Sequence, residues 1–471
     1  MPRVNSVYQT ERSKRGLPLA LVLACGAQFM VVLDGLIVNV TLPDMKSGLG
    51  LSTSGQQWVI NGYLITGGGF LLLASRAADL LGHRRVFLFG LAVFSLASLA
   101  GGLSPNGSFL LVARVVQGIG AAALAPASLS LLTTTHTGQD NTRALSLWSA
   151  TSGSAGALGL VLGGIITGTL GWRWVLLINV PVGVVLWILA STSLPRSRRV
   201  DRAPLDLPGA ILITLSIGAL VYGISQANET GWASARVVLA LVSFVVLIMF
   251  FLRVERDNRD ALIPLAIFRR RTIIVANTVM VFLGVIMTAT LFFLSQYEQR
   301  VLGYSPLRTG LSLLPMSIVI TLGAMASKTL LPKIGARRML TGGALVMVAG
   351  LLWMADLSTR ADYPVHILGP TLLWAAGASI VTMPCVSIAT RGIEPELAGL
   401  ASGLINTARQ TGGAIGIAAL SSIAAAVTTR AHSGDPYQNI VHGYAAALIV
   451  ASGIALLVAL IASQHNQADP A

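Results

Sequence analysis

Two charged residues stand inside long apolar runs of this sequence. Asp34 lies in the run 17–42 and Arg114 lies in the run 108–133. An ionisable side chain at the depth of a lipid bilayer costs about 2.5–3.5 kcal/mol to insert, so each of the two is a candidate functional residue. At 1.5 Å per helical residue, both lie about 9–12 Å below the same membrane surface, which permits them to pair.

A carboxyl group buried beside an arginine is subject to two opposing effects. Desolvation favours its protonated form, and the arginine favours its ionised form. Asp34 is therefore predicted to take up a proton on one side of a membrane and to release it on the other, with Arg114 as its partner. The alternative is a permanent ion pair that only fixes two helices together, because a buried pair is weak evidence for stability.

The composition supports a membrane environment for these residues. The chain has 471 residues, of which 54% are hydrophobic and 11% charged, and its mean hydropathy is +0.75. Soluble proteins average about 25% charged residues. Both cysteines, Cys25 and Cys385, lie in apolar runs, which excludes a disulfide framework or a cysteine zinc site. The six histidines are scattered among loops and ends, so neither a metal site nor an enzyme active site is expected.

Fourteen apolar runs are long enough to cross a bilayer as helices. They are 17–42, 53–74, 85–103, 108–133, 143–168, 173–192, 207–226, 235–252, 273–297, 307–331, 338–357, 365–388, 397–428 and 442–463. With both termini in the cytoplasm, 23 of the 32 Lys and Arg residues lie in cytoplasmic segments, seven lie outside and two lie within spans. The net charge of +14 is therefore a topology signal and not a nucleic-acid footprint.

An internal repeat divides the chain. A Gly–x–Arg–Arg core at Gly82 recurs 253 residues later at Gly335, each time between the second and third helix of a six-helix set. We predict an all-α membrane protein of two six-helix bundles with two additional helices between them. The predicted segments are a cytoplasmic tail 1–16, a first bundle 17–192, a linker with two helices 193–272, a second bundle 273–463 and a cytoplasmic tail 464–471.

With this arrangement the sequence resembles the major facilitator superfamily, in particular its fourteen-helix drug–proton antiporter branch. Five patterns carry the resemblance: L-D-G-L-I-V-N-V-T-L-P at 33–43, S-R-A-A-D-L-L-G-H-R-R-V at 75–86, R-V-V-Q-G-I-G-A-A at 114–122, G-L-V-L-G-G at 159–164 with G-W-R-W-V-L-L-I-N-V-P-V-G at 171–183, and G-L-I-N-T-A-R-Q-T-G-G-A-I-G at 403–416. The chain departs from the branch at Gly35, Ser75, His83 and Leu160, where Thr, Gly, a basic residue and Pro are usual.

The resemblance implies roles for several of these residues. Asp34 and Arg114 would couple transport to protons. A cytoplasmic gate would be formed by Asp79, Gly82, Arg84 and Arg85. Asp79 would meet the N-terminus of the helix that begins near Leu397 in the outward-facing state. The glycines Gly156, Gly159, Gly163 and Gly164 would form either a bending seam between the bundles or ordinary tight packing. Leu160 stands where the branch usually has Pro, so a kink-forming residue is missing, which weakens the expectation of strict antiport.

Further residues are candidates for a cavity of mixed polarity. They are Trp58, Asn61, Tyr63, Gln117, Gln296, Tyr297, Asn406, Arg409 and Gln410, although aromatic residues near span ends are commonly interfacial anchors. Arg409 is near the middle of its span with no acid at that depth in the second half. It either bonds backbone carbonyls or Gln410, or faces the cavity and meets Asp34 or an anionic substrate. Glu298 is either an exposed loop acid or a second protonation or cation site.

The resemblance implies proton-coupled export of lipophilic or amphipathic drugs by alternating access. The alternative is a dedicated exporter of one endogenous metabolite or antibiotic, and a remote alternative is a non-transporting membrane sensor. A sensor would need a soluble signalling domain, and the predicted tails and loops are short. No cofactor is expected, because the proton motive force would supply the energy for transport. The expected partners are small lipophilic substrates, protons and lipids, with a functional monomer in the plasma membrane.

Overall fold

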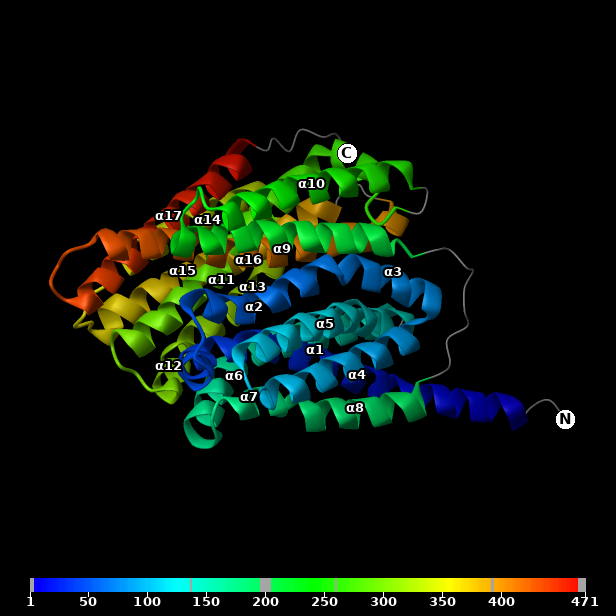
Figure 1. Cartoon of the computed structure of the whole chain (residues 1–471). Helices are drawn as coiled ribbons and strands as arrows, with labels where there is room; N and C mark the ends of the chain where they lie inside the picture. The colour runs from blue at the N-terminus through cyan, green and yellow to red at the C-terminus, as the bar shows by residue number, and fades with distance from the viewer. Residues whose placement is uncertain (1–3, 136–137, 195–204, 259–260, 391–393, 465–471) are drawn as a thin grey trace.

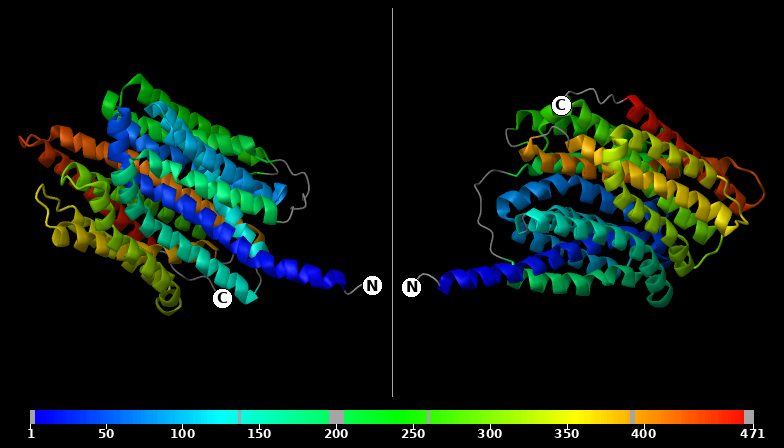
Figure 2. Two further views of the ribbon diagram at one scale, coloured as in Figure 1. Left: turned by 90° about the horizontal axis from the view of Figure 1, so that it is seen from below. Right: turned by 180° about the vertical axis from the view of Figure 1, so that it is seen from behind.

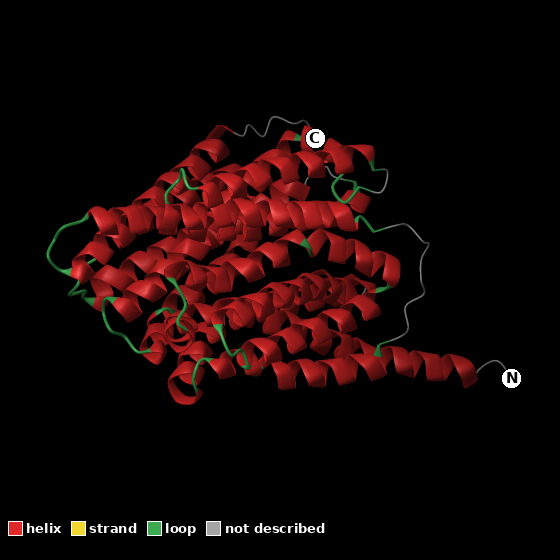
Figure 3. Ribbon diagram, viewed as in Figure 1, coloured by secondary structure: helices red, strands yellow, loops and turns green. Residues whose placement is uncertain are grey.

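The computed structural model describes residues 4–135, 138–194, 205–258, 261–390 and 394–464. Within these ranges the secondary structure is entirely helical, and the helices pack side by side with their axes roughly aligned (Figures 1 and 3). Long apolar stretches adopt helices in a membrane because a helix satisfies its backbone hydrogen bonds internally. The predicted all-α architecture is confirmed. The tail 465–471 and the linker segment 195–204 lie outside the described residues.

The first bundle precedes a helical hairpin. Its helices are α1 (Val4–Leu49), α2 (Thr53–Gly69), α3 (Leu71–Leu81), α4 (His83–Gly102), α5 (Gly107–Thr135), α6 (Gly138–Leu170), α7 (Arg173–Leu177) and α8 (Asn179–Ser193). The hairpin consists of α9 (Leu207–Thr230) and α10 (Ala235–Asp257), at the place of the predicted two-helix insertion. The N-terminal end of α1 projects beyond the other helices (Figures 1 and 2).

The second bundle follows the hairpin. Its helices are η1 (Leu265–Arg269), α11 (Arg271–Arg300), α12 (Pro306–Ser312), α13 (Leu314–Ile334), α14 (Ala336–Met354), η2 (Tyr363–Leu368), α15 (Gly369–Thr390), α16 (Pro395–Arg430) and α17 (Pro436–Gln464). We call the side of the molecule where α1 begins the terminal side, and the other the far side. The predicted topology assigns the terminal side to the cytoplasm.

The predicted count of fourteen membrane-crossing helices is not exactly confirmed. Twelve described helices are long and apolar enough to cross a membrane, and the pair α2 and α3, bent by 44°, makes thirteen if it is counted as one span. The count of fourteen is therefore not reached. The predicted span 338–357 corresponds to α14, whose 19 residues include Arg337 and Arg338 in the first turn. These charges shorten its apolar stretch.

The loops of the predicted repeat have the same backbone geometry in both bundles. Gly82 lies between α3 and α4 with a φ of 96°, and Gly335 lies between α13 and α14 with a φ of 84°. Glycine adopts such positive φ values without the steric cost that a side chain would add. The two Gly–x–Arg–Arg cores therefore form the same sharp turn between consecutive helices.

The arginines of this motif fasten the last helix of each bundle. Arg84 Nη2 donates a hydrogen bond of 2.6 Å to the carbonyl of Ser191 in α8. Arg337 Nη2, at the equivalent position, donates to the carbonyl of Ser463 in α17. Basic side chains suit this position because the last carbonyls of a helix have no partner within the helix. Arg84, predicted to belong to a gate, thus makes a contact inside its own bundle.

The two bundles meet closely at α6 and α12. A Cβ atom added to Gly164 would lie 2.5 Å from the carbonyl oxygen of Pro306, and one added to Gly310 would lie 2.3 Å from that of Leu160. In the same half of the molecule, Ser295 Oγ of α11 donates to the carbonyl of Asn39 in α1 at 2.9 Å. The bundles are therefore in direct backbone contact toward the far side.

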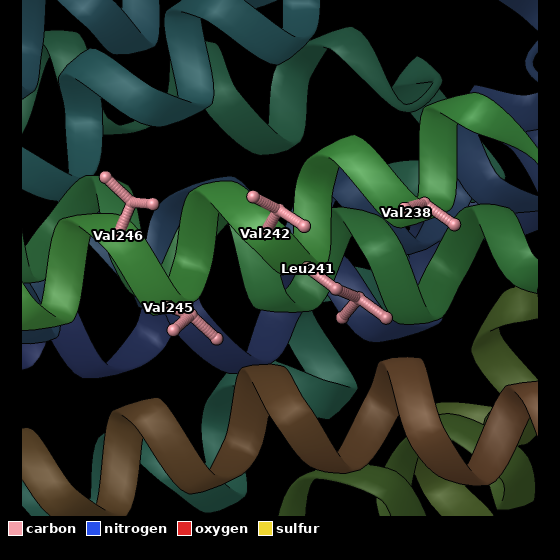
Figure 4. A pocket seen from close by; sticks show the side chains of 5 residues that line it. All are labelled: Val238, Leu241, Val242, Val245 and Val246. Carbon is pink, nitrogen blue, oxygen red and sulfur yellow. The ribbon is translucent and has the colours of Figure 1, made fainter.

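The inserted hairpin lies on the outside of both bundles. Ser422 of α16 donates a hydrogen bond of 3.0 Å to the carbonyl of Ile224 in α9. Only 17% of the most apolar stretch of α10 is buried, against 72% for α11. Figure 4 shows a shallow hollow on α10 lined by Val238, Leu241, Val242, Val245 and Val246. Such a surface suits lipid contact.

Candidate functional site

Asp34 and Arg114 form a buried ion pair in the first bundle. Arg114 Nη1 lies 2.6 Å from Asp34 Oδ2. The exposed fractions of the two side chains are 0% and 1%. The pair joins α1 to α5, as the similar predicted depths permitted.

The guanidinium of Arg114 is held on several sides. Its Nε donates to the carbonyl of Val59 at 3.0 Å, and its Nη1 also lies 2.6 Å from Gln117 Oε1. The Tyr63 ring stacks against it, with the guanidinium carbon 4.4 Å from the ring centre. The Tyr63 hydroxyl donates to the carbonyl of Val31 in α1 at 3.3 Å. Arg114 therefore links α1, α2 and α5.

Two neutral amides complete the environment of the Asp34 carboxylate. Gln117 Nε2 and Asn179 Nδ2 both donate to Asp34 Oδ1 at 2.8 Å. Gln117 Nε2 also lies 2.8 Å from Ser98 Oγ in α4. All these side chains are buried. The carboxylate thus has three donors, from α5 and α8, and none of its partners is exposed.

Asn179 and Ser98 were not identified as functional residues from the sequence. Asn179 is 145 residues from Asp34 in the chain. It lies at the start of α8, just after the short helix α7 ends at Leu177. Two signals were available for Asn179: it is a polar amide in an otherwise apolar segment, and it belongs to the pattern at 171–183.

Glu298 is a second buried carboxyl group, in the second bundle. Its exposed fraction is 0%, so the interpretation of an exposed loop acid is wrong. Ser312 Oγ of α12 donates to Glu298 Oε2. Its other oxygen, Oε1, is buried without a hydrogen-bond partner among the described residues. The far end of α11 is covered by α12, which the apolar pattern of the sequence did not predict.

Several residues predicted to line a cavity belong instead to helix interfaces. The Trp58 ring lies 6.2 Å from that of Tyr222 in the inserted hairpin. Tyr297 is buried, and its hydroxyl donates to the carbonyl of Ser358 at 2.5 Å. The side-chain amides of Asn61 and Gln296 are buried and have no hydrogen-bond partner among the described residues.

The predicted residues of α16 are arranged differently. Gln410 packs against α2, where its Oε1 would lie 2.7 Å from a Cβ atom added to Gly67. Asn406 and Arg409 are exposed. The Asn406 amide donates to the carbonyl of Ser402 at 3.3 Å, and the Arg409 side chain makes no hydrogen bond or ion pair with any described residue. The predicted bond from Arg409 to Gln410 or to backbone carbonyls is therefore absent from the described part of the chain.

Asp79 of the predicted gate was expected to meet the start of α16, and residues 391–393, which precede that helix, lie outside the described residues. Asp79 is exposed and bonds to none of the described residues, and Arg85 is exposed as well. α3 and α16 touch directly, since a Cβ atom added to Gly403 would lie 2.5 Å from the Leu72 side chain, and the loop that follows α10 packs against both helices. Leu262 and Ile263 of this loop pack with Leu72 of α3 and Leu404 of α16 in one apolar cluster.

Two acids of the inserted hairpin hold this loop in place. Asp206 Oδ2 accepts a hydrogen bond from the amide of Leu262 at 3.2 Å, and Glu255 Oε2 accepts one from the amide of Ile263 at 3.0 Å. Both acids are buried. The hairpin is thereby connected to α3 and α16 through the apolar cluster of this loop, a contact that no sequence motif indicated.

The glycines of α6 serve two interfaces. Gly156, Gly159 and Gly163 face α1, where added Cβ atoms would lie 2.8–3.4 Å from atoms of Leu33, Leu36 or Ile37. Gly164 instead faces α12 of the second bundle. Three of the four residues thus support tight packing within the first bundle, and one supports contact between the bundles.

Two repeated bundles of apolar helices with charged residues at bilayer depth define a polytopic membrane protein of the secondary-transporter type. The model of the Major Facilitator Superfamily matches residues 24–417. The chain belongs to this superfamily and is a multi-pass membrane protein. A D-xylose–proton symporter has a similar fold, with a TM-score of 0.68 at 13% identity over 95% of this chain and 97% of that one.

Relatives in sequence carry names that refer to export and resistance. The cephamycin export protein of Amycolatopsis lactamdurans is 40% identical over 89% of each chain. The puromycin resistance protein of Streptomyces alboniger is 38% identical over 98% of this chain and 93% of its own. A multidrug resistance protein of Mycobacterium tuberculosis is 32% identical over 87% of this chain and 76% of its own.

Proposed function

We propose that this protein exports small amphipathic compounds, antibiotics among them, across the plasma membrane in exchange for protons. The observation that carries the proposal is the buried Asp34–Arg114 pair with its hydrogen-bond network. The names of the relatives supply the direction of transport and the class of substrate. The protein itself catalyses no covalent step in this cycle, and the proton motive force is its only energy source.

Asp34 is the proton carrier in the proposed cycle. Protonation removes the negative charge that holds Arg114, so the links among α1, α5 and α8 change when the proton arrives. A proton that moves into the cytoplasm releases about 2.3 kcal/mol of free energy per 100 mV of membrane potential, and this free energy drives export. In the outward-facing state, protonation of Asp34 weakens substrate binding, and the substrate is released outside. The protonated carrier then turns inward, releases the proton to the cytoplasm and binds the next substrate there. Both chain ends stay in the cytoplasm, and one copy of the chain suffices.

A dedicated exporter of one antibiotic is the second candidate. It is favoured by the relatives of highest identity given above, since the names of both refer to a single antibiotic, whereas that of the multidrug protein at 32% does not. Both candidates use the same proton site. They differ in the number of substrates that one protein accepts, which competition between unrelated compounds measures.

Transport into inverted membrane vesicles tests proton coupling. The wild-type protein accumulates an amphipathic dye or puromycin when the vesicle interior is acidified, and an uncoupler abolishes the accumulation. Asp34→Asn reduces accumulation to background, because the amide keeps the shape of the side chain and cannot carry a proton. Asp44→Asn is the matched control, since it makes the same change ten residues further along α1 and outside the network. Undiminished accumulation by folded Asp34→Asn protein overturns the proposal.

A further inference from the structure

We propose that Arg409 and Asn406 form a binding site for the carboxylate group of an amphipathic substrate. This inference rests on the proposed export function, and it names the chemical class of substrate that the second bundle recognises. It is independent of the proton site, because Asp34 and Arg114 belong to the first bundle. The site is built from one face of α16.

Contacts on either side of this face fix its direction. Gly412 and Gly416 pack against the backbone of α11, and Gln410 packs against α2. Between these two faces, a side chain at Gly413 would meet both Leu64 of α2 and Thr288 of α11. Gly413 therefore points between the two bundles.

Arg409 and Asn406 lie on the same face as Gly413. Arg409 precedes Gly413 by four residues and Asn406 precedes it by seven, which are the spacings of one helix face. Contacts with α9, such as the one made by Ser422, come from another side of α16. The two exposed side chains thus face the space between the bundles and not the lipid.

Arg409 has no counter-ion among the residues that the structure describes. Asp34 already receives three hydrogen bonds within its own network, and Glu298 is covered by α12. Glu394, at the start of α16, forms an ion pair with Arg270 at 3.6 Å. Among the described residues, no acid forms an ion pair with Arg409. A cation in the transmembrane part of a protein calls for a compensating charge.

The available donors match a carboxylate. A free guanidinium presents parallel N–H groups that bind the two oxygens of a carboxylate together. Asn406 adds an amide group that uses one of its two N–H donors on Ser402. Leu64 lies beside the same face and offers apolar contact. An organic anion with an apolar body therefore fits this face better than a cationic drug does.

A pair of probes that differ only at the carboxyl group tests the inference. Rhodamine 110 carries a free carboxylate, and rhodamine 123 is its methyl ester. Binding of each to the purified full-length protein is measured by fluorescence anisotropy, and transport of each is measured in inverted vesicles. Arg409→Gln weakens binding of the acid about 10- to 100-fold, the range of a charge-assisted hydrogen bond, and leaves binding of the ester unchanged.

Further variants separate recognition from folding. Arg409→Lys retains the charge but not the paired donors, so its affinity for the acid lies between wild type and Arg409→Gln. Arg430→Gln is the matched control, since it removes an exposed arginine from the last turn of the same helix. Equal losses for acid and ester, or an unchanged affinity for the acid in Arg409→Gln, overturn the inference, as does a wild-type protein that does not bind the acid.

The two proposals fail in different ways. If the wild-type protein binds the acid through Arg409 but a pH gradient moves neither probe, proton-coupled export is wrong and the anion site stands. If the gradient drives the ester alone, and the acid neither binds nor is transported, export stands and the anion site is wrong.

Discussion

The two bundles share the same turn between consecutive helices, but they differ in whether their charged side chains form ion pairs. The Gly–x–Arg–Arg loops at Gly82 and Gly335 make the same turn. In the first bundle, the acid and the base at membrane depth neutralise each other, and both are buried. In the second bundle, Arg409 is exposed without a described counter-ion. Glu298 is buried there, and within the described part of the chain only one of its oxygens accepts a hydrogen bond.

Under the proposed function, this difference favours separate roles for the two bundles. A neutralised network changes when a proton enters it, and it needs no ligand to be complete. A cation that faces the space between the bundles, and that has no counter-ion among the described residues, is available to bind an anionic ligand. Under the proposed function, the first bundle senses the proton and the second bundle binds the substrate.

The largest expected effect is on the stability of the first bundle. Arg114→Leu leaves the Asp34 carboxylate buried without its cation, which lowers the free energy of unfolding by about 3–5 kcal/mol. Arg409→Leu in the second bundle removes an exposed cation and leaves stability almost unchanged. Denaturant unfolding in detergent micelles, followed by tryptophan fluorescence, compares the two variants.

A double variant shows whether the unpaired charge causes the loss. Asp34→Leu combined with Arg114→Leu removes both charges and regains most of the stability lost by Arg114→Leu alone. It does not regain proton-coupled transport. Equal destabilisation by Arg114→Leu and Arg409→Leu contradicts the contrast between the bundles.

The sequence was sufficient for the architecture and for the central pair. Apolar runs set the positions of the helices, and the spacing of Gly82 and Gly335 indicated the repeat. Asp34 and Arg114 were identifiable because a charge inside an apolar run is conspicuous, and their similar depths allowed the pairing that the structure contains. The count of fourteen spans is not exactly confirmed, because two arginines in the first turn of α14 shorten its apolar stretch.

The partners of these residues were not predictable, because they depend on which helices touch. Asn179 reaches Asp34 across 145 residues, and no local pattern encodes the distance between α1 and α8. Glu298 was placed at a span end by counting residues, whereas the packing of α12 over it decides its burial. The exposure of Arg409 likewise depends on how α2 and α11 flank α16.

An intermediate effect is expected at the buried carboxyl of the second bundle. Ser312→Ala removes the hydroxyl that donates to Glu298 and leaves the carboxyl without a hydrogen bond, at a cost of about 1–3 kcal/mol. Glu298→Gln costs less, because the Ser312 hydroxyl also has the carbonyl of Thr309 within 2.8 Å. Unfolding in detergent measures both variants. If Glu298→Gln lowers the free energy of unfolding more than Ser312→Ala does, another group stabilises the Glu298 carboxyl more strongly than Ser312 does.

The smallest expected effect concerns the repeated arginines, where the two bundles are alike. Arg84→Ala removes the bond to the end of α8 and costs about 1 kcal/mol, the value of an ordinary hydrogen bond. Arg337→Ala costs less, because Arg337 is exposed and water replaces its contact with the end of α17. Unfolding in detergent again gives both values, and Arg85→Ala, which changes the exposed neighbour, serves as the control. If Arg84→Ala loses transport while its stability is unchanged, this arginine belongs instead to the gate that its motif implies. The two loops would then share their backbone conformation but not the role of their arginines.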